Sequence, residues 1–262
     1  MTSTLHVGTG THRGPLSLFP VWRATVPGPV VALADERTVA VRELDDPQVP
    51  RLAVTATTPV PVLLLDGLLL RGGWQDRTAV ASTVLAPGRT TTVDVRCVEP
   101  HRWGGGAGHV ARGRSSARVR AVSEQDEVWR RVAEEHARLA VPPEVADLAP
   151  LPGQCGVVVG IGGRPLALEL FAHPDLLAAA FAELVAAAAR DAAGAPARRT
   201  TAHDARELAI AAAAVLLTST GPAGRGRALR GSRGTLRGRG VEWRGRALHT
   251  CVLDHAHQAV SA

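Results

Sequence analysis

The sequence predicts an α+β fold with mainly antiparallel β-sheets, sandwich-like or in two layers, and about three packed helices. Three observations lead to this prediction. Short segments rich in valine and leucine recur along the chain, 27 glycines and 18 prolines supply turns between them, and alanine-rich segments with a helical pattern lie in the second half. With 262 residues and no long linker, the chain is expected to form a single domain over residues 1–262.

The first half of the chain has the pattern of antiparallel strands. Four short apolar segments are separated by proline, glycine and aspartate: residues 16–21, 30–34, 39–44 and 51–56. Residues 60–65 are different because they are apolar on both faces, which is typical of a strand inside a sheet or between two layers. A tight turn at Asp66 and Gly67 is then predicted, after which the chain reverses its direction over residues 68–70.

A predicted β-hairpin follows, with strands over residues 78–85 and 90–98 and a turn at Pro87 and Gly88. Polar side chains stand directly before the first strand and directly after the second. Because antiparallel pairing brings these two ends together, we expect a ligand site there. The candidate residues are Gln75, Asp76, Arg77, Glu99, Arg102 and Trp103.

The residue types in this cluster suit the recognition of an anionic ligand. A carboxylate such as Glu99 can act as an acid or base, and an arginine can hold an anionic group through two parallel hydrogen bonds. Trp103 can stack on a planar ligand. The alternative is that the same residues are turn residues and surface ion pairs at the end of a sheet.

Three helices are expected in the second half, over residues 124–139, 175–193 and 201–217. Ser123 is the predicted N-cap of the first helix, with Leu139 on its buried face. Pro174 occupies the first turn of the second helix, and Gly194 ends it.

Two hairpins and two irregular segments complete the expected organisation. The hairpins are residues 157–161 with 165–170, and a strand pair within residues 241–253. The glycine-rich residues 104–117 are expected to form a mobile loop, and the tail from about residue 255 is expected to be flexible.

Every basic residue other than histidine is an arginine, and the formal net charge is +6. This charge permits attraction to phosphate-bearing partners, but it does not identify one. The arginine- and glycine-rich residues 225–246 suit contact with a nucleic-acid backbone or a pyrophosphate. Because arginine is the basic residue used throughout the chain, a solvated loop and strand face is the favoured interpretation, and nucleic-acid binding is not expected.

The remaining features favour a cytoplasmic protein without a membrane segment. The N-terminus has no basic segment followed by an apolar run, and no stretch reaches the roughly 20 apolar residues of a membrane span. Cys97, Cys155 and Cys251 are widely separated, so a disulfide framework is not expected. Cys97 precedes His101 by four residues, but a zinc site needs further ligands. No metal site is predicted, and the cofactor and the oligomeric state stay open.

Several motifs resemble those of a known family. They include Gly72-Gly-Trp-Gln-Asp-Arg and Arg96-Cys-Val-Glu-Pro-His-Arg-Trp, and further matching segments are residues 10–20, 62–67, 125–129, 151–156, 169–171 and 247–249. The family is the bacterial and archaeal domain named for its association with ADP-ribosylglycohydrolases and rhodanese or phosphatase proteins. The resemblance implies a role linked to NAD and ADP-ribose metabolism.

The resemblance also implies which residues carry function. Matching positions are Gln75, Arg77, Glu99, Arg102, Trp103, Gln154 and His249. Among them Glu99 and His249 are the expected proton-transfer groups, and Gln154 is expected to orient the ligand. Leu68 and Leu69 stand where the family usually has paired glutamates, so a catalysis carried by those acids in relatives would be lost here.

The leading hypothesis is therefore a protein that binds or processes an ADP-ribose-like or other nucleotide-like small molecule. A non-catalytic β-rich interaction module is the main alternative, in which the segment around Gln75 is purely structural. Nucleic-acid binding through residues 225–246 is the third and least favoured interpretation.

Overall fold

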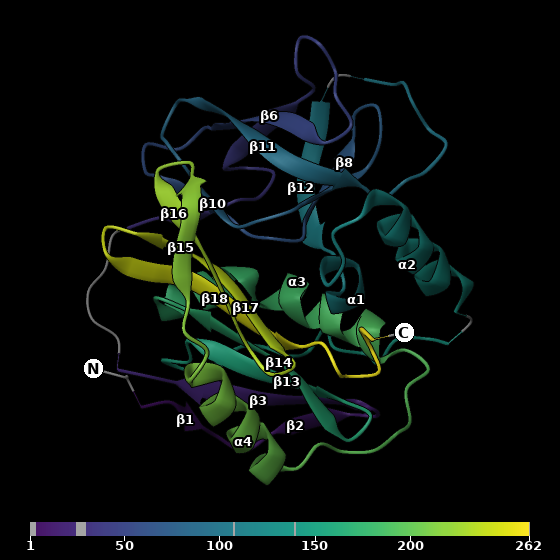
Figure 1. The fold of residues 1–262 in the computed structure, drawn as a ribbon, viewed down its shortest axis with the longest axis vertical. Helices are drawn as coiled ribbons and strands as arrows, with labels where there is room; N and C mark the ends of the chain where they lie inside the picture. Colours follow the sequence, from purple (N-terminus) through teal and green to yellow (C-terminus); the bar gives the residue numbers. More distant parts are fainter. Residues whose placement is uncertain (1–3, 25–29, 107, 139, 262) are drawn as a thin grey trace.

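The computed structural model describes residues 4–24, 30–106, 108–138 and 140–261. Figure 1 shows the strands of a barrel in the upper half of the molecule and a large sheet in the lower half. Almost all strand pairs are antiparallel, and helices pack on the sheets. The predicted α+β class with mainly antiparallel sheets is confirmed.

The large sheet combines strands from both ends of the chain. Within the described residues its nine strands are β1 (His6–Val7), β2 (Thr11–Arg13), β3 (Leu16–Trp22), β13 (Gly156–Ile161), β14 (Arg164–Phe171), β15 (Thr218–Ala223), β16 (Gly226–Arg233), β17 (Leu236–Trp243) and β18 (Arg246–Asp254). Their order is β1-β3-β13-β14-β18-β17-β16-β15, with β2 also paired to β3. The N-terminal strands join the C-terminal strands where β3 pairs with β13, so the chain leaves this sheet and later returns to it.

The chain between these two parts forms a closed barrel. Its strands in the described residues are β5 (Val39–Arg42), β6 (Arg51–Ala56), β8 (Leu68–Gly72), β9 (Arg77–Ala79), β11 (Thr90–Cys97) and β12 (Gly108–Arg114). They follow the order β11-β6-β5-β12-β8-β9, and β9 pairs back with β11. Because every pair is antiparallel, three connections meet at one mouth of the barrel, and their described residues are 43–50, 73–76 and 98–106.

A small three-stranded sheet lies between the barrel and the large sheet. It contains β4 (Ala32–Leu33), β7 (Val62–Leu64) and β10 (Thr83–Leu85), with β7 in the middle. Alternate side chains of β7 enter different cores, because Leu64 packs inside the barrel core and Leu63 packs with the large sheet. The prediction that residues 60–65 lie between two layers is confirmed.

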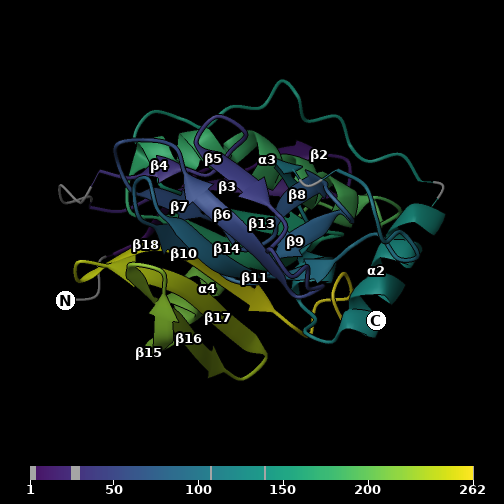
Figure 2. The ribbon, with the colours of Figure 1, turned by 90° about the horizontal axis from the view of Figure 1, so that it is seen from above.

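The helices are α1 (Ala117–Arg120), α2 (Gln125–Ala137), α3 (Pro174–Ala192) and α4 (Ala202–Ala213). Helix α3 packs on the face of the large sheet that looks toward the barrel, and α4 packs on the opposite face (Figures 1 and 2). The three expected helices are confirmed, although Leu139 lies outside the described residues. Ser123 is not the N-cap of α2: Glu124 holds that position without a side-chain cap, because Ser123 Oγ turns toward the Glu124 carboxylate.

The predicted hairpin is correct at its open end and wrong in its length. Arg77 lies opposite Cys97, so the two polar segments do meet as expected. The expected strand over residues 78–85 is broken in two, because β9 closes the barrel and β10 joins β7 in the small sheet. For the same reason residues 68–70 do not pair with β7: β8 pairs with β9 and β12 instead.

Two segments expected to be mobile are built into the fold. Within the mobile loop expected at residues 104–117, residues 108–114 form β12 and pair with β5 and β8 to close the barrel. The tail expected to be flexible from residue 255 contacts the core. His257 is fully buried and its Nε2 lies 3.2 Å from the carbonyl oxygen of Ile161, and Ala259 and Val260 join the core. These contacts were not visible as local sequence patterns.

The arginine-rich segment forms strands as well. Residues 226–233 and 236–243 are β16 and β17, and their hairpin continues the large sheet beyond β18. Among the described residues, no helix combines the length and the apolar character that crossing a membrane requires.

Replacing Leu64 by alanine tests the position of β7 between the layers. Leu64 is fully buried in the barrel core, so we expect Leu64→Ala to lower the free energy of unfolding by about 2–5 kcal/mol. Urea titration followed by circular dichroism measures this change. Leu216→Ala is the control, because Leu216 is 79% exposed. Equal effects of the two substitutions would contradict the buried placement of β7.

Candidate functional site

One face of the large sheet carries a row of polar side chains toward the barrel. In the antiparallel register, Glu169 of β14 lies opposite Cys251 of β18, which lies opposite Arg239 of β17. Arg239 in turn lies opposite Arg230 of β16. Leu253, two residues along from Cys251 and thus on the same face, belongs to the core shared with α3. The row therefore runs from the middle of the sheet toward its edge and faces the barrel.

Asp66 reaches this row from the turn between β7 and β8. Its backbone N–H donates to Ser82 Oγ at 3.0 Å, which fixes the turn. Gly67 has a φ of 79°, and a Cβ at this position would lie 2.3 Å from Cδ of Arg120. Glycine is thus required both by the backbone conformation and by the close approach of Arg120. The Asp-Gly pair serves to aim a carboxylate between the layers.

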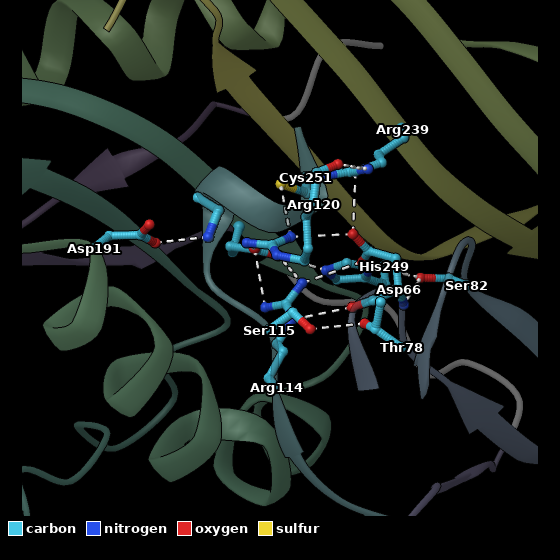
Figure 3. A network of polar contacts seen from close by, with 12 residues as sticks. Asp66, Thr78, Ser82, Arg114, Ser115, Arg120, Asp191, Arg239, His249 and Cys251 are labelled. Carbon is cyan, nitrogen blue, oxygen red and sulfur yellow. Dashed lines mark hydrogen bonds and ion pairs between the residues drawn. The ribbon is translucent and has the colours of Figure 1, made fainter. Parts of the chain in front are cut away.

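The carboxylate of Asp66 meets the guanidinium groups of three arginines at this point (Figure 3), and a second carboxylate, that of Glu169, contacts two of them. Asp66 is held by Arg114 at 3.1 Å, by Arg120 at 3.0 Å and by Arg239 at 3.1 Å. Glu169 is held by Arg114 at 3.0 Å and by Arg120 at 3.3 Å. We call these five residues and His249 the charged network. It joins the barrel, through Asp66 and Arg114, to the large sheet.

The pKa values of both carboxyl groups are set by the same competition. Burial favours the neutral form of Asp66, but the guanidinium groups of Arg239, Arg114 and Arg120 outweigh it and hold the pKa of Asp66 well below its usual range. Burial likewise opposes ionisation of Glu169, and Arg114 and Arg120 together with a hydrogen bond from His249 lower its pKa. Both groups are therefore ionised at neutral pH, and the three arginines leave an excess of positive charge.

A hydrogen-bonded series of serine, histidine and carboxylate, as found in nucleophilic catalysis, is formed by Ser82, His249 and Glu169. His249 Nε2 lies 2.6 Å from Glu169 Oε2, and His249 Nδ1 lies 3.2 Å from Ser82 Oγ. Ser82 is nearly fully buried, however, and its oxygen already accepts the N–H of Asp66. A nucleophile must reach its substrate, so this arrangement fixes His249 and Asp66 and does not present a reactive hydroxyl.

A cavity of about 530 Å3 opens beside Arg120 and Arg239, between the barrel, α2 and the edge strands of the large sheet. We call it the arginine pocket. Its basic lining residues are Arg96, Arg120, Arg230, Arg237, Arg239 and His255. Asp66 is the single acid among the lining residues described, and three arginines already hold it. The pocket is therefore strongly positive.

Several of these arginines have no carboxylate partner. Arg230 lies directly opposite Arg239, an arrangement of like charges that destabilises a pair of strands. Arg237 donates to the carbonyl oxygens of Gly234 at 2.5 Å and Leu236 at 3.2 Å. Within the described part of the chain, neither Arg230 nor Arg237 makes an ion pair.

The pKa of His255 reflects the same positive surroundings. Burial, followed by the nearby charges of Arg237 and Arg239, lowers the pKa of His255. Apolar side chains from the barrel and α2 side complete the lining, including Val80, Val122 and Val128. The pocket thus offers cationic groups from the large sheet and an apolar surface opposite them, a combination suited to an anionic organic ligand.

Six sequence-predicted residues lie elsewhere, at the barrel mouth. Arg77 is fully buried there and donates from Nη1 to the carbonyl oxygens of Gln48 and Val49. Its Nη2 is 3.9 Å from Glu43 Oε1, and Glu43 also contacts His109 Nε2 at 3.0 Å. Burial lowers the pKa of Arg77, and the charge of Glu43 opposes this effect. Arg77 closes the end of the barrel from within.

The connections at the barrel mouth place the other predicted residues above Arg77. Arg102 Nη2 is 2.5 Å from Glu99 Oε2 and 3.4 Å from Asp76 Oδ1. The hydrogen bond from Arg102 to Glu99 lowers the pKa of Glu99. Trp103 is 50% exposed and meets Trp74 edge-on at 5.0 Å. Gln75 is buried and lies beside Asp76 in the connection between β8 and β9. The predicted cluster is therefore assembled, but its arginines are already engaged, and a ligand-binding role remains a prediction.

Gln154 and His249 are not part of that cluster. Gln154 is buried and closes its own turn, because Oε1 accepts the N–H of Leu151 at 2.9 Å and Nε2 donates to the carbonyl oxygen of Gly156 at 2.8 Å. His249 belongs to the charged network. Glu99 and His249, the two expected proton-transfer groups, share no hydrogen-bond partner among the described residues.

Leu68 and Leu69 occupy the positions where the resemblance implies acids. Leu68 packs in the barrel core, and Leu69 lines a second cavity of about 500 Å3 together with Glu99 and His136. That cavity is also lined by Arg71, Arg190 and Glu135, so its charged groups are of both signs, whereas Asp66 is the single acid among the described lining residues of the arginine pocket. The arginine pocket therefore has the stronger attraction for an anionic ligand.

Sequence reasoning named the segment that holds Arg230, Arg237 and Arg239 as suited to a pyrophosphate or a nucleic-acid backbone, but it missed Arg114 of the charged network and Arg120. Arg114 lies in the segment expected to be a mobile loop, and Arg120 lies in a helix of four residues that no pattern announced. Arg237 and Arg239 carried a usable signal, because they alternate with glycines as a strand with one polar face would. Within the described part of the chain, no group of three or more His, Cys, Asp or Glu side chains is arranged to hold a metal ion.

Comparison with known proteins places the whole chain in one family. A family model described as the ARG and Rhodanese-Phosphatase-superfamily-associated Protein domain, ARPP-1, matches residues 4–253. The chain belongs to the ARPP-1 family. This ARPP-1 domain matches no curated protein and no solved structure. The family resemblance inferred from the motifs is confirmed at the level of the domain, and the matched residues include the barrel, the charged network and almost all of the arginine pocket.

Replacing Glu169 by glutamine tests the charged network. The substitution removes one of two buried anions and leaves buried guanidinium groups short of a partner, so we expect the free energy of unfolding to fall by about 3–5 kcal/mol at pH 7. Because the pKa of Glu169 is lower in the folded protein than its ordinary value of 4.5, its contribution is present above pH 4.5 and is lost as the pH falls below it. Urea titrations from pH 7 to pH 3 measure both effects.

The control for this experiment is Glu207→Gln, because Glu207 is exposed on α4. It should leave stability within about 0.5 kcal/mol of the unmodified protein. If Glu169→Gln behaved like this control at pH 7, the charged network would not be what joins the barrel to the large sheet.

Proposed function

We propose that this ARPP-1 domain acts in NAD- or ADP-ribose-linked metabolism by binding an ADP-ribose-like ligand in the arginine pocket. The observation that carries the proposal is that Arg230 and Arg237 face this cavity without carboxylate partners among the described residues. The family resemblance supports the choice of ligand, because the motifs resemble a domain named for its association with ADP-ribosylglycohydrolases.

Charge and size both support a phosphate-bearing ligand. Guanidinium groups form charge-assisted, often bidentate hydrogen bonds with phosphates. A bound anion would also offset the repulsion between Arg230 and Arg239, which lie opposite each other. The volume of about 530 Å3 falls within the usual range of roughly 300–1,000 Å3 for small-molecule sites.

The residues of the pocket have different parts in this proposal. Arg230 and Arg237 have free donors and contact the ligand directly. Arg120 and Arg239 are tethered to Asp66 and present a fixed positive surface. His249 is a positioning residue, because it acts through Asp66 and Glu169 and does not line the pocket. Glu99 lies at the barrel mouth and takes no part in binding at this pocket.

Nucleic-acid binding through residues 225–246 has less support. Arg230, Arg237 and Arg239 from this segment turn into the pocket. An extended nucleic-acid backbone is normally followed by a row of cations on an open surface. The gathering of these cations around one cavity suits a small anionic ligand better.

Replacing Arg237 by alanine tests the proposed pocket. We expect ADP-ribose to bind the unmodified protein, and Arg237→Ala to weaken binding about 10- to 100-fold, because one charge-assisted hydrogen bond contributes roughly 1.5–3 kcal/mol. Isothermal titration calorimetry with ADP-ribose and NAD measures the affinities. The matched control is Arg233→Ala, which removes an exposed arginine of the neighbouring strand β16 that does not line the pocket. Absence of binding by both ligands to the unmodified protein would refute the proposal.

The pH dependence of binding gives a second test. Arg237 and Arg239 help to keep the pKa of His255 below 6.5, so this side chain is neutral at pH 7 in the free protein. A bound anion favours the protonated form and raises that pKa. We therefore expect affinity for ADP-ribose to increase as the pH falls from 8 to 6, and His255→Gln to reduce this dependence. Calorimetry in buffers of different ionisation enthalpy detects the proton uptake; the same pH profile in both proteins would exclude His255 as its source.

A further inference from the structure

The lining of the arginine pocket is uneven in its chemistry. Three arginines of the large sheet occupy one side in a fixed register: Arg230 and Arg239 lie directly opposite, and Arg237 lies two residues from Arg239 on the same face of β17. Side chains directly opposite on neighbouring strands have Cβ atoms about 4.5–5.5 Å apart, and diagonal neighbours lie roughly 7–8 Å apart. Three cations are therefore held within the reach of one extended anion.

This arrangement suits two linked phosphates better than one. A single phosphate has one centre of charge and cannot approach all three guanidinium groups equally. A diphosphate carries two negative charges at neighbouring positions along the ladder of strands. It therefore balances more of the repulsion between Arg230 and Arg239.

The rest of the lining has few of the groups that read a base. Among the residues described as lining the pocket there is no tryptophan, phenylalanine, asparagine or glutamine. Besides the arginines, the polar side chains of the lining are Asp66, Thr78, Ser123, Ser232 and His255, and of these only His255 has a ring that can stack on a base. Thr78 Oγ1 accepts a hydrogen bond from Ser115 at 2.8 Å, and Ser123 Oγ turns toward Glu124. The carboxylate of Asp66 is held by three arginines. Bases are usually identified by aromatic stacking and by amide or carboxylate hydrogen bonds.

We propose that the arginine pocket recognises the diphosphate of its ligand and does not discriminate the base. The expected ligands are then diphosphates with a nucleoside on one phosphate and a second organic group on the other. The base of the nucleoside is adenine or another base. This inference rests on the proposed function and makes it more specific. Arg230, Arg237 and Arg239 select the diphosphate, while the apolar surface at Val122 and Val128 accepts a base or sugar without identifying it.

A comparison of four ligands tests the inference. Isothermal titration calorimetry at one ionic strength measures the affinity of the protein for ADP-ribose, UDP-glucose, AMP and ribose 5-phosphate. We expect the two diphosphates to bind with affinities within about threefold of each other despite their different bases. AMP and ribose 5-phosphate should bind about tenfold or more weakly, because each loses at least one charge-assisted contact.

Variants at Arg230 identify the selecting group. Arg230→Ala should weaken ADP-ribose binding about tenfold and change AMP binding by less than about twofold. Arg230→Lys keeps the charge but loses the planar fork, so it should give an intermediate affinity for ADP-ribose. Arg233→Ala, on the same strand but outside the pocket, should leave all four affinities unchanged.

The outcomes separate this inference from the proposed function. Binding of ADP-ribose with UDP-glucose more than about tenfold weaker would show that the base or the terminal sugar is read, which overturns the inference and leaves the proposed function standing. Equal binding of AMP and ADP-ribose would overturn the role of the diphosphate in the same way. Failure of all four ligands to bind would overturn the proposed function itself.

Discussion

The contact of Asp66 with three arginines is the interaction on which the rest of the structure depends. Asp66 comes from the turn between β7 and β8, Arg114 comes from the barrel, and Arg239 comes from the large sheet. A buried carboxylate is tolerated only with charged partners. The position of the barrel against the large sheet is thus tied to a set of directional contacts, in addition to the apolar packing around Leu63.

The same contacts prepare the surface of the arginine pocket. Arg120 and Arg239 face the cavity while their guanidinium groups are held by Asp66, so they need no reorganisation to meet an anion. The network contains more guanidinium groups than carboxylates, and Arg230 and Arg237 add further charge. Structural stability and affinity for an anion are in this way connected through one turn of the chain.

Much of the fold follows from local pattern. The two-sided apolar character of residues 60–65 placed β7 between layers, and the three long helices and most strands occur where their periodicity indicates. Local pattern failed where pairing partners are distant in the sequence. Residues 108–114 contain glycine and alanine, which are depleted in strands, and they form β12 through their pairing with β5 and β8.

The candidate site likewise has some features that followed from the sequence and others that did not. The sequence by itself determined the meeting of Arg77 and Glu99 at one end of a hairpin, because antiparallel pairing of neighbouring segments fixes which ends coincide. Only the tertiary structure decided that these residues close the barrel mouth and that Asp66 joins Arg120 and Arg239 beside a cavity. The contacts of Asp66 with Arg120 and Arg239 connect residues more than 50 positions apart, and their strength depends on burial, which is a property of the assembled layers and not of any local segment.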